Sequence, residues 1–146
     1  MNRHKKLAIL MAPFLAVAGY IIAGYMVDAP EPPMRALVME KDCRITAADC
    51  LLQTLGLSLN LSADQKLEAG QSVTIKMTSS EKLDDALISF AGKKQQSRPH
   101  RLYEKEENIW QESVFIESDV DTKQLYLRLV VGWQGSIYFA DEKIQQ

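Results

Sequence analysis

The residues of this chain with the clearest chemical potential are two cysteines, Cys43 and Cys50, seven positions apart in the segment CRITAADC. Two thiols at this spacing meet where the chain turns, but stay apart in one regular helix or strand. A reactive or metal-binding pair would favour a C-x-x-C spacing or a neighbouring histidine or methionine cluster. The segment therefore predicts a disulfide, worth about 2 kcal/mol for so short a loop, which pins the start of the folded domain. A reactive or metal-binding thiol pair is the alternative.

Residues suited to acid-base or nucleophilic catalysis are sparse. The only histidines are His4 and His100, and the orientation derived below predicts them on opposite sides of a membrane, so a triad or histidine metal site would have to use His100 alone. Glu117, Asp119 and Asp121 resemble the start of a calcium loop, but its glycine and distal glutamate are missing, which favours a solvated turn. We therefore predict that the protein is not an enzyme, with no cofactor, no metal and no evident small-molecule substrate.

A local basic cluster lies in the segment GKKQQSRPHR. Lys93, Lys94, Arg98 and Arg101 are its permanent charges, with His100 between the last two. Such a cluster could face anionic lipid headgroups or an acidic partner. We take these four residues as candidates for partner binding, while an ordinary solvated loop is the simpler interpretation.

An uncharged apolar run, LAILMAPFLAVAGYIIAGYMV, occupies residues 7–27. Its 21 residues meet the length of about 20 that a helix needs to cross the hydrocarbon core of a bilayer. A buried helix of a soluble domain would show a polar stripe, and this run has none. We therefore predict a transmembrane helix, in which Gly19 and Gly24 leave small surfaces where a partner helix could approach.

The segment before the run raises the question of cleavage. Arg3, Lys5 and Lys6 form a positive region, and residues 16–18 offer an A-x-A cleavage site. Cleavage after Ala18 would leave GYIIAGYMV as an exposed apolar terminus, which suits a soluble protein poorly. A signal-anchor that stays attached is therefore predicted, with a cleaved signal peptide as the alternative.

The charges on either side of the run predict its orientation. Positive residues precede it, whereas Asp28 and Glu31 follow it, and positively charged flanks remain in the cytoplasm. Residues 28–146 are then expected across the membrane, which in a bacterium means an inner-membrane protein with a periplasmic domain. That part has 14 basic and 19 acidic residues, a formal charge of −5, which disfavours nucleic acid as a partner.

The remaining chain is long enough for one compact domain. Three prolines in DAPEPP predict a stiff, extended linker before it. The segment ITAADCLLQTLG is ambiguous and could form a short helix that ends at Gly56. The predicted divisions are a cytoplasmic N-terminus over 1–6, a transmembrane helix over 7–27, a proline-rich linker over 28–36 and a periplasmic β-domain over 37–146.

Apolar residues with a period of two dominate the second half of the chain. In LGLSLNLSA, Leu55, Leu57, Leu59 and Leu61 alternate with small residues, as in a half-buried strand. Similar runs, separated by polar turns, follow at 71–79, 83–92, 107–118, 123–131 and 135–142. This spacing predicts a mainly β protein whose domain is an immunoglobulin-like antiparallel β-sandwich. The alternative is a small open barrel, or an α+β fold with a packed helix over 44–55.

The combination of a short N-terminal span, a brief linker and a β-domain with LISFAG, IWQESVFI and QLYLRLVVGW resembles FixH-like proteins. The shared pattern, over about residues 7–140, is a strand ending at Gly92, a strand with Trp110 and a strand close to the C-terminus. The resemblance implies a small membrane-anchored protein that accompanies respiratory-oxidase assembly and copper delivery, and cysteines before the first strand fit it. The chain departs from the pattern after Gly92, where KKQQSRPH offers none of the soft sulfur ligands that copper(I) prefers.

The sequence thus favours a non-enzymatic, membrane-anchored accessory protein that binds or helps to assemble a larger inner-membrane complex, which the resemblance suggests is respiratory. Its expected partners are an integral membrane protein complex and the lipid bilayer. The alternative is a periplasmic thiol or copper carrier that uses Cys43 and Cys50. That carrier would require free thiols in the purified protein.

Overall fold

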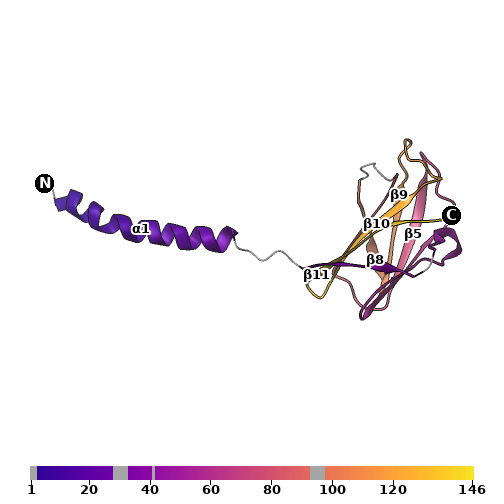
Figure 1. The fold of residues 1–146 in the computed structure, drawn as a ribbon, viewed down its shortest axis with the longest axis horizontal. Coiled ribbons are helices and arrows are strands. Elements are labelled where there is room, and N and C mark those ends of the chain that lie inside the picture. The colour runs from indigo at the N-terminus through magenta and orange to yellow at the C-terminus, as the bar shows by residue number, and fades with distance from the viewer. Residues whose placement is uncertain (1–2, 28–32, 41, 93–97) are drawn as a thin grey trace. The chain divides into compact units, whose positions relative to one another are not determined.

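The computed structural model describes residues 3–27, 33–40, 42–92 and 98–146, with the side chains of the N-terminal helix described over residues 12–24. Contacts divide the chain into two compact units, Met1–Glu31 and Pro32–Gln146. The first unit contains one helix, and the second contains all eleven described strands (Figure 1). The chain is therefore mainly β, as predicted.

The helix predicted over residues 7–27 is present as α1 (Arg3–Val27). Alanine and leucine, which favour helices, are frequent in it. The helix continues through Pro13, which removes one backbone hydrogen-bond donor from its interior. Among the described residues, no helix has both the length and the apolar character needed to cross a membrane.

The first sheet has five strands in the order β1-β11-β10-β6-β7. Strand β10 lies at its centre and pairs antiparallel with both β6 and β11, whereas β1 pairs parallel with β11. The short strand β7 forms the other edge. The bounds are β1 (Met34–Ala36), β6 (Asp85–Ala91), β7 (His100–Arg101), β10 (Tyr126–Trp133) and β11 (Ser136–Lys143).

The second sheet has six strands in the order β2-β3-β4-β5-β9-β8, and every pairing in it is antiparallel. Its edges are β2 and β8, so both sheets have a short strand at each edge. The bounds are β2 (Val38–Met39), β3 (Leu51–Thr54), β4 (Leu57–Ala63), β5 (Ser72–Ser79), β8 (Tyr103–Glu106) and β9 (Ile109–Phe115).

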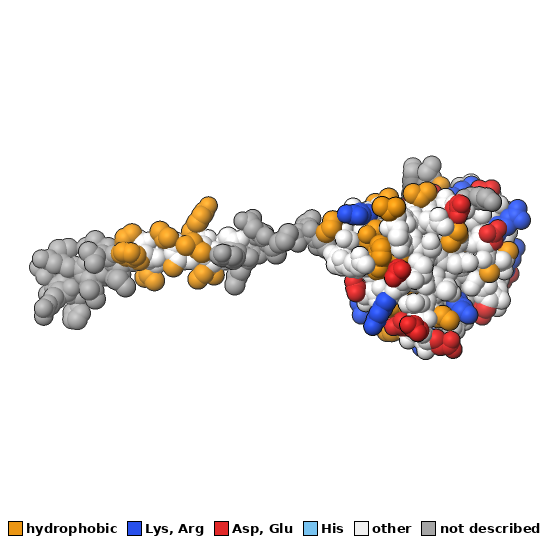
Figure 2. Space-filling view, turned by 90° about the horizontal axis from the view of Figure 1, so that it is seen from below, with side chains coloured by type: hydrophobic (Ala, Val, Ile, Leu, Met, Phe, Trp, Pro, Cys, Tyr) orange, Lys and Arg blue, Asp and Glu red, His pale blue; other side chains and the backbone are white. Residues whose placement is uncertain are grey.

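One apolar core lies between the two sheets, consistent with the predicted β-sandwich. In β4, Leu57, Leu59 and Leu61 are at most 1% exposed, and Leu127 and Leu129 of β10 are fully buried. Because successive side chains of a strand point to opposite faces, this alternation buries one face of each sheet. The predicted runs correspond to β4, β5, β6, β9, β10 and β11. Acidic and basic side chains are interspersed on the face of the domain that Figure 2 shows.

Residues 44–55 do not form the helix that the sequence allowed. They contain one 3-10 turn, η1 (Ile45–Ala47), followed by β3. Ala48, with a φ of 56°, lies in the left-handed region, which ends the turn after three residues and reverses the chain. Leu52 then pairs with Leu59 and is fully buried. The alternative fold with a packed helix at this place is therefore wrong.

The segment 34–39 closes one side of the sandwich by passing from one sheet to the other. Its first three residues pair with β11 as β1, and Val38 and Met39 pair with β3 as β2. Leu37, between them, is 3% exposed and donates its backbone N–H to the carbonyl of Phe139 at 2.7 Å. Strand β1 thus occupies the last three residues of the predicted linker 28–36, of which residues 28–32 lie outside the described residues.

Leu55, the first leucine of the predicted alternation, does not lie in a strand. Thr54 pairs with Leu57, so Leu55 and Gly56 form a two-residue turn between β3 and β4, and Leu55 is 97% exposed. Gly56 has a φ of 88°, a conformation that glycine adopts without strain. A Cβ added there would lie 3.2 Å from Cη2 of Trp133. The indole of Trp133 therefore packs directly beneath this turn.

The substitution Gly56→Ala is expected to lower the free energy of unfolding by about 1–3 kcal/mol, because it adds left-handed backbone strain and crowds Trp133. Gly135→Ala is the matched control, since Gly135 has a φ of 75° and no heavy atom lies within 4 Å of its Cβ position. Chemical denaturation measures both variants. Equal losses would contradict the packing of Trp133 beneath Gly56.

Candidate functional site

Cys43 and Cys50 form the predicted disulfide. Both are buried, at 1% and 0% exposed. The loop between them is closed by two backbone hydrogen bonds, from Arg44 N to Asp49 O at 3.0 Å and from Asp49 N to Arg44 O at 3.2 Å. The turn that the two thiols need is supplied by η1 and by the left-handed conformation of Ala48.

The disulfide loop is also tied to two distant parts of the domain. The carbonyl of Cys43 accepts a hydrogen bond from the N–H of Gln145 at 2.8 Å, and that of Cys50 accepts one from the N–H of Leu61 at 2.9 Å. The cross-linked loop between β2 and β3 therefore contacts both β4 and the segment after β11. Thiol–disulfide exchange needs an accessible sulfur, so the burial of both cysteines fits a structural cross-link.

The structure describes only part of the predicted basic cluster. Lys93 and Lys94 lie outside the described residues. Arg98 is exposed, and Arg101 is exposed on the edge strand β7. Nη2 of Arg101 lies 3.2 Å from Oδ2 of Asp85 on the neighbouring strand β6. The positive charge of Arg101 is therefore already paired with a carboxylate of the same domain.

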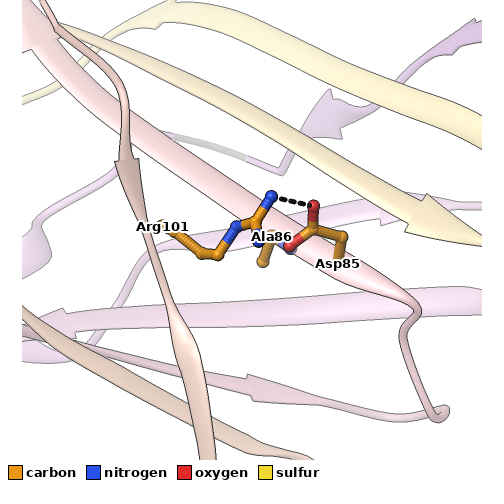
Figure 3. A network of polar contacts seen from close by, with 3 residues as sticks. All are labelled: Asp85, Ala86 and Arg101. Carbon is orange, nitrogen blue, oxygen red and sulfur yellow. Dashed lines mark hydrogen bonds and ion pairs between the residues drawn. The ribbon is translucent and has the colours of Figure 1, made fainter.

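Asp85 connects this ion pair to the backbone of β6 (Figure 3). Its second oxygen, Oδ1, accepts a hydrogen bond from the N–H of Ala86 at 2.9 Å. The side chains of Arg101 and Asp85 are 56% and 44% exposed, and a pair this exposed contributes at most about 1 kcal/mol. An acidic partner would have to displace Asp85 from the guanidinium, which makes Arg101 a weaker candidate than its charge alone suggests.

Gly19 and Gly24 leave open surface on α1. Within the described residues, no heavy atom lies within 4 Å of either Cβ position. Five positions of a regular helix correspond to a rotation of about 140°, so the two glycines do not form one GxxxG seam. Each could admit a neighbouring helix on its own side, and their role in partner binding stays a prediction.

An acidic hollow of about 660 Å³ lies between the β5–β6 loop and the β8–β9 hairpin. Sequence inspection missed it because its residues come from two distant segments. Among the described residues, no group of three or more His, Cys, Asp or Glu has the geometry to hold a metal ion. The hollow is lined by four glutamates and two lysines, with a serine and an asparagine: Glu81, Glu104, Glu106, Glu107, Lys82, Lys105, Ser80 and Asn108.

The acidic segment Glu117–Asp121 belongs to a turn. Oδ1 of Asp121 accepts a hydrogen bond from the N–H of Lys123 at 3.0 Å, and its carbonyl accepts one from the N–H of Gln124 at 3.2 Å. This use of an aspartate side chain is typical of turns. His100 is half-buried on β7, where it pairs with Ile88 of β6.

Replacing both cysteines, as Cys43→Ala with Cys50→Ala, is expected to lower the free energy of unfolding by about 2–3 kcal/mol, because the unfolded chain loses a constraint. Denaturant unfolding measures the change. The native protein is expected to react with a thiol reagent only after it is both unfolded and reduced. Free thiols that titrate in the native protein would contradict the disulfide and favour the carrier hypothesis.

Comparison with known proteins identifies no matching family model, no matching curated protein and no matching solved structure.

Proposed function

We propose that this chain is a non-enzymatic, membrane-anchored accessory protein, whose periplasmic β-domain binds or helps to assemble a larger inner-membrane complex. The observation that carries the proposal is the buried disulfide in the part of the chain that follows the apolar helix. Structural disulfides are typical of oxidising compartments. The charges around residues 7–27 predict, independently, that this same part lies outside the cytoplasm.

The proposed anchor is α1. Residues 7–27 have the length and the lack of charge that a membrane helix needs. The described side chains of α1 are exposed, and a helix that is apolar all round requires apolar surroundings. Its large apolar side chains that are at least half exposed are Phe14, Leu15, Val17, Tyr20, Ile21 and Ile22.

We also propose that the sandwich is of the immunoglobulin type. The order β4-β5-β9-β8 corresponds to the A-B-E-D sheet of that fold, and β11-β10-β6-β7 corresponds to G-F-C with an added C′ strand. Strands β1 to β3 are then an addition at one side. The Cys43–Cys50 disulfide lies outside the strands that antibody domains cross-link. Sandwiches of this architecture are common in cell-surface binding domains, which fits a partner-binding role.

A respiratory complex is the partner that the resemblance to FixH-like proteins suggests. The test is purification of the full chain, tagged at its C-terminus, from native membranes in mild detergent. We expect the chain to stay in the membrane fraction after alkaline carbonate washing and to co-purify with an integral membrane complex in fixed stoichiometry, identified by mass spectrometry. A chain that migrates alone in the same detergent would contradict the accessory role.

Matched variants of α1 distinguish an interface from a tether. Gly19→Leu with Gly24→Leu is expected to reduce the yield of the co-purified complex, because bulky side chains block close helix approach. Ala18→Leu is the control, since Ala18 lies about 100–120° around the helix from either glycine. Equal yields from all three chains would show that the helix only tethers the domain.

A further inference from the structure

The outer face of the first sheet carries a row of apolar side chains. Strand pairing places four of them side by side, in the order Ala36 of β1, Phe139 of β11, Val130 of β10 and Leu87 of β6. We call these four residues the apolar row. Phe139 and Val130 are 38% and 37% exposed, Ala36 is exposed and Leu87 is half-buried. Because the alternate residues of β10 lie in the core, the apolar row faces outward.

Two further rows flank the apolar row on the same face. On one side, paired residues continue the apolar surface toward the end where the chain enters the domain, in the order Met34, Ile137, Gly132 and Asp85. On the other side, Arg128 of β10 pairs with Asp141 of β11, and Nε of Arg128 lies 3.4 Å from Oδ1 of Asp141. An apolar centre with charged side chains at its margin is the usual composition of a protein interface.

Gly132 is the feature of this face that the domain itself does not require. It lies within β10 and is paired on both sides, with Ile137 and with Asp85. Its φ lies outside the left-handed region, and a Cβ added there would lie 3.5 Å from Cβ of Asp84, an ordinary contact. A glycine weakens a strand, and it often marks a place where another molecule comes close to the backbone. Gly132 therefore points to an occupant of the outer face.

The face is large enough for a second copy of this chain. Five strands at about 4.8 Å span about 24 Å, and the eight residues of β10 extend about 26 Å. Two such faces, laid on one another, bury up to about 1,200 Å² in total, the lower end of the range for specific protein interfaces. The area therefore suits a dimer of moderate affinity.

The charge of the face also suits a second copy. Residues 28–146 have 14 basic and 19 acidic residues, a formal charge of −5, so two copies carry the same net charge and repel one another. The outer face of the first sheet is different, since its described residues include three basic and two acidic side chains: Arg101, Arg128, Lys143, Asp85 and Asp141. Two copies that meet through this face therefore avoid the contact of one acidic surface with another.

A two-fold axis that runs along the apolar row satisfies these features together. Each residue of the row then meets the same residue of the second copy, with Val130 near the centre. Arg128 and Gly132 lie two positions to either side of Val130 in β10, so they face each other across the interface. The missing side chain at Gly132 leaves room for the guanidinium of Arg128, beside Asp85 of the second copy.

We propose that two copies of this chain pair through the outer face of the first sheet, with their apolar rows in contact and Arg128 of each copy over Gly132 of the other. Pairing of this kind leaves the outer face of the second sheet free for another partner. The inference does not depend on the inner-membrane complex of the proposed function.

Cross-linking through an introduced cysteine tests the pairing and its position. The full chain with Val130→Cys, in membranes, is treated with a short bifunctional maleimide, to which Cys43 and Cys50 are closed by their disulfide. Most of the chain is expected to become a covalent dimer of itself, because the two introduced thiols lie near the axis. Thr78→Cys is the matched control, since Thr78 is an exposed residue of β5 in the second sheet. It is expected to remain monomeric.

Substitutions in the face test its chemistry by sedimentation equilibrium of the full chain in detergent. Gly132→Ala is expected to raise the dissociation constant of the dimer about tenfold, as for a central contact, while the stability of the fold is kept. Val130→Lys is expected to abolish the dimer, because it brings two like charges together at the axis. Thr78→Lys, on the outer face of the second sheet, should leave the dimer unchanged.

The outcomes separate this dimer from other associations of the chain. Equal cross-linking of Val130→Cys and Thr78→Cys overturns the inference, and so does a cross-linked product that contains a different protein. A native chain that sediments as a monomer at every concentration also overturns it. A dimer that survives either Gly132→Ala or Val130→Lys is held elsewhere, for example through α1, and contradicts the pairing of the two sheets. Near-ultraviolet circular dichroism verifies that each variant is folded.

Discussion

The burial of two leucine-rich sheet faces against each other is the constraint on which the rest of this domain depends. Strand β10 is central to it, since it pairs on both sides and places Leu127 and Leu129 in the core. Each fully buried leucine contributes about 1.5–3 kcal/mol relative to exposure. Two stacked sheets leave open sides, however, and the buried Leu37 closes one of them where the chain changes sheets. The disulfide loop and its bonds to Gln145 and Leu61 hold neighbouring segments over the same core.

Sequence patterns predict the strands that bury one face, whereas strands that are exposed or very short leave no pattern. The longer strands were found because a half-buried strand must alternate apolar and polar residues. The sequence does not predict strand β8, because all of its residues, Tyr103–Glu106, are exposed. Strands β1, β2 and β7 are too short to show a period. Leu55 was placed in a strand because residue type alone cannot show that Thr54 pairs with Leu57 across a turn. The disulfide was predictable because a fixed spacing limits the local geometries that join two thiols.

The surface sites are of two kinds: some are formed by one segment of the sequence, and others are formed by segments far apart in the chain. The basic segment around Arg98 and Arg101 is visible in the sequence, but its pairing with Asp85 depends on strand register. The acidic hollow is assembled from segments far apart in the chain, and no local pattern marks it. It lies at turns and at the edge strand β8, where side chains do not have to pack in the core. The charged surface sites of this domain therefore lie at the edges of its sheets and in the turns beside them.

The parallel pairing of β1 with β11 has a mechanical consequence. The chain reaches β1 at Met34, beside Ile137 near the start of β11, and β11 runs on to Lys143. Tension along the strand axis, applied through the linker and resisted at the far end of β11, loads the backbone hydrogen bonds of this pair together rather than one after another. Shear of this kind resists force better than peeling, because several bonds must break at once. A domain held in this way resists unravelling from its first strand.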